Sequence, residues 1–161
     1  MKEHIYMTHR IVEVKMLDKT CISAEFQNGV VKEYDLSKLY SIYPQFIEIE
    51  KNMHKFQSPK VDEGGYGISW DDELDLDAEE IWENGIEKGV KEPDVCHALA
   101  YNLLYARNSI GMTQRQLAEI TGIYQADISK IERGLANPSL STINRLADGM
   151  GMKLRIEFVS V

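Results

Sequence analysis

The chain has 161 residues, of which 43% are hydrophobic and 27% charged, a balance typical of a globular protein with one large or two small domains. No apolar run approaches the roughly 18 residues of a membrane-spanning helix, and the first residues lack the apolar core of a signal peptide. Cys21 and Cys96 form no CxxC pair, which favours reduced thiols over a redox motif or a zinc site. We therefore expect a cytoplasmic protein with no membrane partner.

The net charge of −8 conceals an asymmetry between the two parts of the chain. Residues 1–94 carry 11 lysines and arginines against 21 aspartates and glutamates, whereas residues 95–161 carry 7 against 5. This difference predicts a division of labour, because only the second part suits a polyanionic partner. The acidic part must then be kept off any DNA that the second part binds.

Apolar and polar residues alternate from position 10 to position 35, which predicts antiparallel strands. The apolar members are Val12, Val14 and Met16 in one strand and Ile22, Ala24 and Phe26 in the next. The Asn28-Gly29 pair is typical of a two-residue type I′ turn that leads into a third strand over 30–34. Such a turn would place Phe26 opposite Val31 on one face and Glu25 opposite Lys32 on the other.

The rest of the acidic part predicts a loop and a short helix over 36–51, and a last strand over 68–70 after a glycine-rich break. The expected result is a small antiparallel sheet with one helix against it. That helix is expected over 78–90, where Trp82, Ile86 and Val90 recur at helical spacing and would pack on the sheet. Residues 81–93 would then be an acidic helical connector.

No arrangement of residues in this part predicts catalysis, because it has no glycine-rich phosphate loop, no His-x-x-x-His motif and no nucleophile with a base beside it. We expect neither an enzyme nor a cofactor. Four alternating acids resemble the start of a calcium loop, namely Asp71, Glu73, Asp75 and Asp77. Position six would be Leu76 rather than glycine, and position twelve would be Trp82 rather than glutamate. We therefore favour a capping box, with Asp77 as N-cap and Glu80 at N3, over a metal site.

Several of these features together resemble a small family of bacterial domains of unknown function. They are the hydrophobic strands, the Asn-Gly turn, the Tyr-Asp-Leu-Ser segment at 34–37 and the strand that ends Ile-Ser-Trp-Asp at 68–71. The resemblance spans about residues 6–80 and implies no chemistry. Members of this family occur alone, fused to helix-turn-helix domains, or near toxin-like genes.

The second part predicts four helices with clear caps. Asp94 would cap the first, in which Val95, Leu99, Leu103 and Ala106 recur up to Gly111. Thr113 and Ser139 would cap the second and the fourth, and a third helix would run from about 124 to 133. Gly122 would end the second helix and Gly134 the third. Two short helices joined by a tight glycine turn are the signature of a helix-turn-helix.

The run from Arg107 to Ser139 closely resembles the Cro/C1-type (xenobiotic-response-element, XRE) helix-turn-helix family. The ending Leu-Arg-Ile-Glu-Phe at 154–158 is similar to the HigA-type antitoxin subgroup. The resemblance covers about residues 97–158 and implies an all-α, lambda-repressor-like domain. We therefore expect an α+β protein with domains at 1–80 and 94–161, joined by the connector over 81–93.

The resemblance also implies roles for individual residues. Arg107 and Glu132 would form a largely buried ion pair that ties the first helix to the recognition helix. Phosphate contacts would come from Thr113, Gln114, Arg133 and Asn137. Base edges in the major groove would be read by Tyr124, Gln125, Ala126 and Lys130, since glutamine can pair with adenine, alanine can touch a thymine methyl and lysine can reach guanine.

Two positions depart from the family pattern. Tyr124 replaces the serine or threonine that usually caps the recognition helix, so either the cap is weaker or the phenol reads DNA. Asp127 falls near N3 of that helix, where we favour interaction with the helix dipole over a bond to cytosine. The core is expected to hold Leu117, Ile128, Ile131 and Leu146, while Ala118 and Gly122 would be small because two helices cross there.

After the fourth helix, apolar and charged residues alternate over 152–158, which predicts a half-buried strand whose apolar face needs a partner. That partner would be the same strand of a second copy or the N-terminal sheet. The leading interpretation is a homodimeric, sequence-specific DNA-binding regulator, an antitoxin-like autorepressor on a palindromic operator. The alternative is a protein-interaction module that neutralises a toxin through its acidic half, with DNA binding as feedback.

Overall fold

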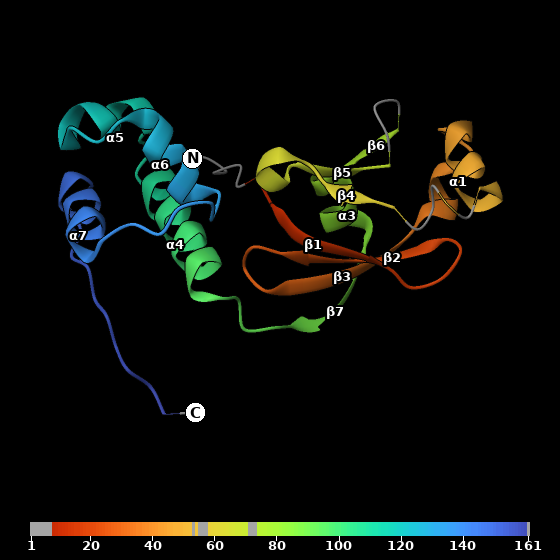
Figure 1. The fold of residues 1–161 in the computed structure, drawn as a ribbon, viewed down its shortest axis with the longest axis horizontal. Helices are drawn as coiled ribbons and strands as arrows, with labels where there is room; N and C mark the ends of the chain where they lie inside the picture. The colour runs from red at the N-terminus through yellow and green to blue at the C-terminus, as the bar shows by residue number, and fades with distance from the viewer. Residues whose placement is uncertain (1–7, 53, 55–57, 71–73, 161) are drawn as a thin grey trace, which may run out of the picture. The chain divides into compact units, whose positions relative to one another are not determined.

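The computed structural model describes residues 8–52, 54, 58–70 and 74–160 (Figure 1). The chain divides into two compact units, Thr8–Pro93 and Asp94–Val161. The expected α+β class is confirmed, because strands dominate the first unit and helices the second. Among the described residues, no helix combines the length and the apolar character needed to cross a membrane.

The first unit contains two antiparallel sheets within the described ranges. One has the order β1-β2-β3-β7, with β1 at Ile11–Met16, β2 at Cys21–Phe26, β3 at Val30–Asp35 and β7 at Ile86–Val90. The other has the order β4-β5-β6, with β4 at Lys60–Val61, β5 at Gly67–Ser69 and β6 at Asp75–Asp77. The single sheet that the sequence predicted is therefore wrong, and the strand expected last lies instead in the middle of the second sheet.

Short helices connect and cover these strands. They are η1 (Leu36–Leu39), η2 (Pro44–Phe46), α1 (Ile47–Lys51), η3 (Glu63–Gly65) and α3 (Ala78–Asn84). The predicted loop and short helix over 36–51 are confirmed. Both sheets share one core with α3, and its largest fully buried side chains include Tyr34, Phe26 and Ile81. Tyr34 also donates its hydroxyl to Glu80 Oε1 at 2.7 Å, so Glu80 binds the core tyrosine from the first turn of α3.

The predicted hairpin of β2 and β3 forms, but its register is displaced by one residue. Glu25 lies opposite Val31 and Ala24 opposite Lys32, so three residues, 27–29, form the loop. Gly29 alone among them has a positive φ (+85°), and its N–H donates to Phe26 O at 2.8 Å. This is the three-residue hairpin connection with a left-handed glycine at its end, rather than a type I′ turn. A shift of one residue reverses the faces of β3, so Lys32 lies over the Trp82 ring, 4.7 Å from its centroid.

The predicted helix over 78–90, and with it the helical connector, is wrong. Asp77 caps the helix as expected by accepting from Glu79 N at 2.7 Å, but the predicted capping box is wrong, since Glu80 accepts from the Tyr34 hydroxyl instead. Helix α3 also ends early, at Asn84. Residues Ile86–Val90 form β7, which pairs with β3. The periodic stripe was misleading, because Ile86 and Val90 are 62% and 67% exposed and only Trp82 packs against the core. The calcium-loop candidates Asp71 and Glu73 lie outside the described residues.

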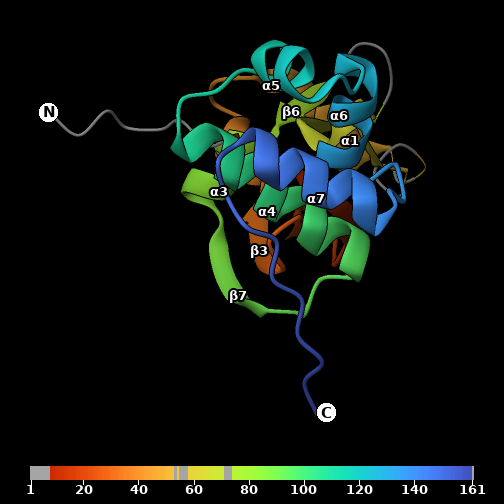
Figure 2. The same cartoon turned by 90° about the vertical axis from the view of Figure 1, so that its left-hand side faces the viewer.

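The second unit has the four predicted helices, α4 (Val95–Ser109), α5 (Gln114–Thr121), α6 (Gln125–Glu132) and α7 (Leu140–Gly149), which Figure 2 shows from a second side. Three expected caps are confirmed: Asp94 accepts from Cys96 N, Thr113 from Gln116 N and Ser139 from Thr142 N. The predicted core residues are confirmed as buried, and they are Leu117, Ile128, Ile131 and Leu146.

Two expectations for this unit are wrong. Gly122 ends α5 in the left-handed conformation (φ +67°), but a Cβ there would meet nothing within 4 Å, so it is conformation and not close packing that calls for glycine. The close approach of α5 and α7 occurs at Gly149, where a Cβ would lie 2.4 Å from Thr121 Cγ2. The predicted C-terminal strand is also not formed: the described residues 152–160 have neither helix nor strand, because no described strand of the single chain pairs with them.

Gly29→Ala is expected to destabilise the first unit strongly. The left-handed backbone alone costs about 1–2 kcal/mol for a residue with a Cβ, and this Cβ would lie 2.0 Å from Lys91 O, where the chain leaves β7. Urea unfolding followed by tryptophan fluorescence measures this unit, since both tryptophans, Trp70 and Trp82, belong to it. Gly89→Ala is the matched control, because Gly89 also has a positive φ but open space around it. An equal loss of unfolding free energy in the two variants would contradict the close approach of Gly29 to Lys91.

Candidate nucleic-acid interface

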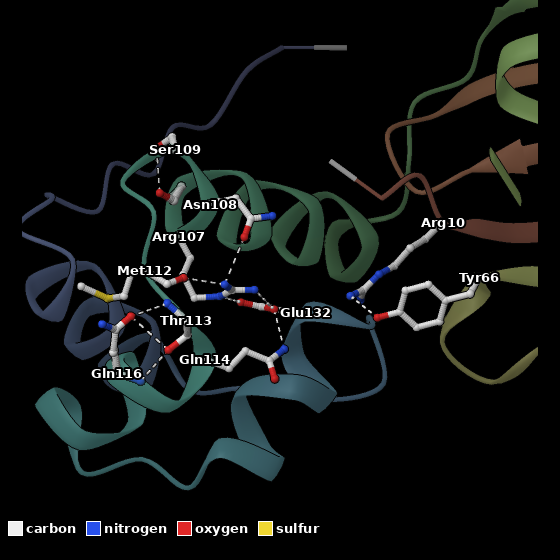
Figure 3. A network of polar contacts seen from close by, with 11 residues as sticks. Arg10, Tyr66, Arg107, Asn108, Ser109, Met112, Thr113, Gln114, Gln116 and Glu132 are labelled. Atoms are coloured by element: carbon white, nitrogen blue, oxygen red, sulfur yellow. Dashed lines mark hydrogen bonds and ion pairs between the residues drawn. The ribbon is translucent and has the colours of Figure 1, made fainter. Parts of the chain in front are cut away.

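A buried ion pair joins α4 to α6 at the centre of the helical unit (Figure 3). Arg107 donates from Nε to Glu132 Oε1 at 2.6 Å and from Nη2 to Oε2 at 2.8 Å. This is the two-pronged geometry in which a guanidinium binds a carboxylate most strongly. The Glu132 side chain has no exposed surface, so its negative charge is stabilised by the protein groups around it and not by water.

Two further contacts extend this pair to α5. Gln114 donates its side-chain amide to Glu132 Oε2 at 2.8 Å, and Arg107 Nη1 donates to Met112 O at 2.7 Å in the turn before α5. The start of α5 is itself fixed by a capping box, in which Thr113 accepts from Gln116 N at 3.1 Å and donates its own N–H to Gln116 Oε1 at 2.8 Å (Figure 3). Arg107 and Glu132 therefore fix the start of α5 as well as α4 and α6.

The four residues predicted to read bases all lie exposed at α6. Tyr124 precedes the helix and is 81% exposed, and its side chain makes no capping hydrogen bond. Gln125 and Ala126 form the first turn, and Lys130 follows one turn after Ala126. The opposite side of α6 is buried through Ile128, Ile131 and Glu132. The helix thus presents one short apolar and several longer polar side chains on an element whose inner side packs in the core.

The residues predicted to bind phosphate lie at both ends of this surface. Thr113 and Asn137 are exposed, whereas Gln114 and Arg133 are half-buried, and Arg133 Nε donates to Ser129 O at 3.4 Å. The amide of Gln114 is therefore partly engaged, but its nitrogen carries two hydrogens and Glu132 takes only one of them. The second hydrogen is available to an anion at the N-terminus of α5.

Sequence reasoning missed Arg145 of α7. A hollow of about 390 Å³ lies between the start of α6, the loop after α6 and α7, and Tyr124, Asp127, Asn137 and Arg145 all line it. Arg145 is exposed and thus adds a cation beside two predicted site residues. The sequence offered one indication of Arg145 as a site residue, namely that it is one of few cations in this unit. Its position near α6 could not be predicted, because it depends on how α7 packs.

Three acids of this unit are paired with arginines. Glu132 pairs with Arg107, Glu119 with Arg115 at 3.0 Å, and Glu157 with Arg155. Lys130 of α6 and Arg145 of α7 are exposed cations, and Arg133 at the end of α6 is half-buried. Among the residues that the structure describes, no three or more histidines, cysteines or acids are grouped so that they could hold a metal ion.

Comparison with known proteins finds two family models that match this chain. Residues 103–156 match one described as "Helix-turn-helix", and residues 11–87 match one described as "Protein of unknown function (DUF2442)". Among curated proteins, an "Uncharacterized HTH-type transcriptional regulator" of Haemophilus influenzae is 34% identical over 70 residues, which are 44% of this chain and 71% of that protein. "Control protein C.SmaI" of Serratia marcescens is 39% identical over 57 residues, 35% of this chain and 68% of that protein.

Arg107→Met is expected to cost the helical unit about 3–5 kcal/mol, because it leaves the buried charge of Glu132 without its main partner. Urea unfolding followed by far-UV circular dichroism measures this loss. The double variant Arg107→Met/Glu132→Leu should lose much less, since two apolar side chains can replace a buried ion pair. Arg115→Met removes an exposed ion pair and serves as the control, with an expected change within about 1 kcal/mol. A single variant as stable as this control would contradict the role given to the pair.

Proposed function

The chain belongs to the Cro/C1-type helix-turn-helix transcriptional regulators, and a DUF2442 domain precedes its helix-turn-helix domain. From this premise we propose that the protein is a homodimeric, antitoxin-like autorepressor of a palindromic operator. The resemblances to the Cro/C1-type helix-turn-helix family and to the domain family of unknown function are confirmed, whereas the similarity to the HigA-type antitoxin subgroup stays a prediction. The family is one of regulators rather than enzymes. DNA binding follows from the family. The dimer, the operator and the antitoxin role are the proposal.

The observation that carries the proposal is the exposed side of α6, held by the buried pair. Gln125 can pair with adenine, Ala126 can touch a thymine methyl and Lys130 can reach guanine in a major groove. Thr113, Gln114, Arg133, Asn137 and Arg145 surround this surface and would bind phosphates. Helix α5 would cross the backbone with its N-terminus toward a phosphate, where helix ends favour anions.

The proposal of a dimer follows from charge. The residues from 95 onward have a small excess of two positive charges, so one copy neutralises few phosphates and gains little affinity from the release of counterions. Two copies double the contacts and place two α6 helices in successive major grooves about 10 base pairs apart. A repressor of this kind acts by occupancy, because it covers a promoter.

Footprinting on the DNA upstream of the gene for this protein tests the proposal. We expect a protected near-palindrome with half-sites about 10 base pairs apart. Gln125→Ala and Lys130→Ala should relax the preference at particular base pairs, each at a cost of about 1–3 kcal/mol. Gln114→Ala and Arg145→Ala should weaken all sites about equally, because a phosphate carries no sequence.

Asn144→Ala, an exposed change on α7 that removes only a bond to Asp148, is the control and should leave affinity and preference unchanged. Identical preference profiles for wild type and all variants would show that another surface reads the bases. The lack of any protected palindrome at moderate salt would overturn the regulator proposal.

A second function, toxin neutralisation by the acidic unit, is favoured by one specific surface. A hollow of about 470 Å³ is lined by apolar residues, among them Leu39, Ile42, Tyr43 and Phe46, and by the acids Asp75, Asp77 and Glu80. A lining of apolar and acidic side chains suits a basic protein segment with large apolar side chains. We expect co-expression with a toxic neighbouring gene to restore growth, and Ile42→Asp to abolish this rescue while Gln125→Ala retains it. Rescue that needs Gln125 and not Ile42 would assign the effect to repression alone.

A further inference from the structure

The segment after α7 is an apolar element without a partner in the part of the chain that the structure describes. The described residues 152–160 run away from the helices as an extended trace in both views (Figures 1 and 2). Ile156 is 56% exposed and Phe158 is fully exposed, and both alternate with the charged residues Arg155 and Glu157. In water this arrangement leaves large apolar side chains uncovered, although their spacing is that of a strand with one apolar face.

The sequence of this segment is complementary to itself in one antiparallel register. If Ile156 faces Ile156 of a second copy, then Leu154 faces Phe158, and Arg155 faces Glu157, in both halves of the pair. One face of the resulting ribbon is wholly apolar and the other carries two pairs of opposite charges. A twofold axis requires this kind of complementarity between identical surfaces.

Other registers lack this match. With Arg155 at the twofold axis, Lys153 would face Glu157 in both halves, but two arginines would face each other directly at the axis, which is destabilising. A parallel pair in register would set every charge against its own copy, Lys153 and Glu157 included. The register centred on Ile156 is therefore the one that charge and apolar pairing favour together.

We propose that two copies of this chain pair through residues 153–159 as antiparallel strands, with Ile156 at the twofold axis. The inference rests on the proposed function and deepens it, because it names the surface that joins the two recognition helices. A two-stranded ribbon is only marginally stable by itself. The free dimer is therefore weak, and neighbouring half-sites strengthen it by holding the two segments at a high effective concentration.

Charge reversal tests the register in the full chain. Arg155→Glu sets two carboxylates opposite each other in both cross-strand pairs, and Glu157→Arg sets two guanidinium groups opposite each other there. Each variant should therefore weaken self-association about tenfold in sedimentation equilibrium. The double variant Arg155→Glu/Glu157→Arg restores both pairs and should return to the wild-type dissociation constant. Lys153→Glu is the matched control, because it makes the same charge change opposite Val159, an apolar residue. Its dissociation constant should stay within about twofold of wild type.

Cysteine cross-linking gives a second measurement, which reports the proximity of two side chains and can trap a weak dimer. Ile156→Cys should form a disulfide-linked dimer under mild oxidation, because directly opposite residues bring their Cβ atoms within the reach of a disulfide. Lys153→Cys should stay at the background that wild type sets through Cys21 and Cys96, since it faces another residue in this register. These exposed positions lie outside every core, so the variants should fold, which circular dichroism verifies.

The outcomes separate this inference from the proposed function. The inference is overturned if Arg155→Glu leaves the wild-type dimer unchanged, or if Ile156→Cys cross-links no better than Lys153→Cys. The segment would then pair with the free edge of β7, with another protein or with nothing. A tail-paired dimer that protects no operator overturns the regulator proposal and leaves the inference in place. Protection of a palindrome by a dimer that is indifferent to Arg155→Glu overturns only the inference.

Discussion

The arrangement of the helical unit depends on one buried carboxylate. Glu132 has no exposed surface, and a charge in that position is tolerated only while its partners remain within hydrogen-bond distance. Arg107 supplies two bonds from α4 and Gln114 supplies a third from α5. Such a group adds little net stability over apolar side chains, but it penalises every arrangement in which the three helices shift. The exposed side of α6 therefore has one orientation relative to the N-terminus of α5.

Helices of this unit could be predicted closely because their signals are local. Asp94, Thr113 and Ser139 cap helices within three residues of themselves, and the glycines that end helices need only their own backbone angles. The strands needed information from elsewhere. Apolar residues four positions apart over 78–90 fitted a helix. Residues 86–90 instead form a strand that pairs with the free edge of β3, more than 50 positions away in the sequence. Tertiary pairing of this kind overrides a local pattern.

The candidate site shows the same division. The family resemblance was enough to expect Gln125, Ala126 and Lys130 on the outward side of α6, and all three are exposed in the structure. Spacing could not reveal that the amide of Gln114 binds Glu132, nor that Arg145 of α7 lines the hollow beside Tyr124, because both depend on how separate helices pack. The one-residue shift in the register of β2 and β3 likewise places Lys32 over the Trp82 ring. The alternation of apolar and polar residues could not distinguish this register from the one expected.

The distribution of charge connects DNA binding by one copy with the pairing of two copies in the proposed mechanism. Of the seven basic residues after position 94, Arg107 is buried with Glu132, and Arg115 and Arg155 lie beside acids, so few cations remain to bind phosphates. Few phosphate contacts make binding by one copy weak, and a weak reader gains specificity only when a second copy binds beside it. A marginal strand pair at the C-terminus suits this requirement, because it adds to affinity where two half-sites hold both copies and little elsewhere. Weak pairing would then favour paired half-sites over the many isolated half-sites of a genome.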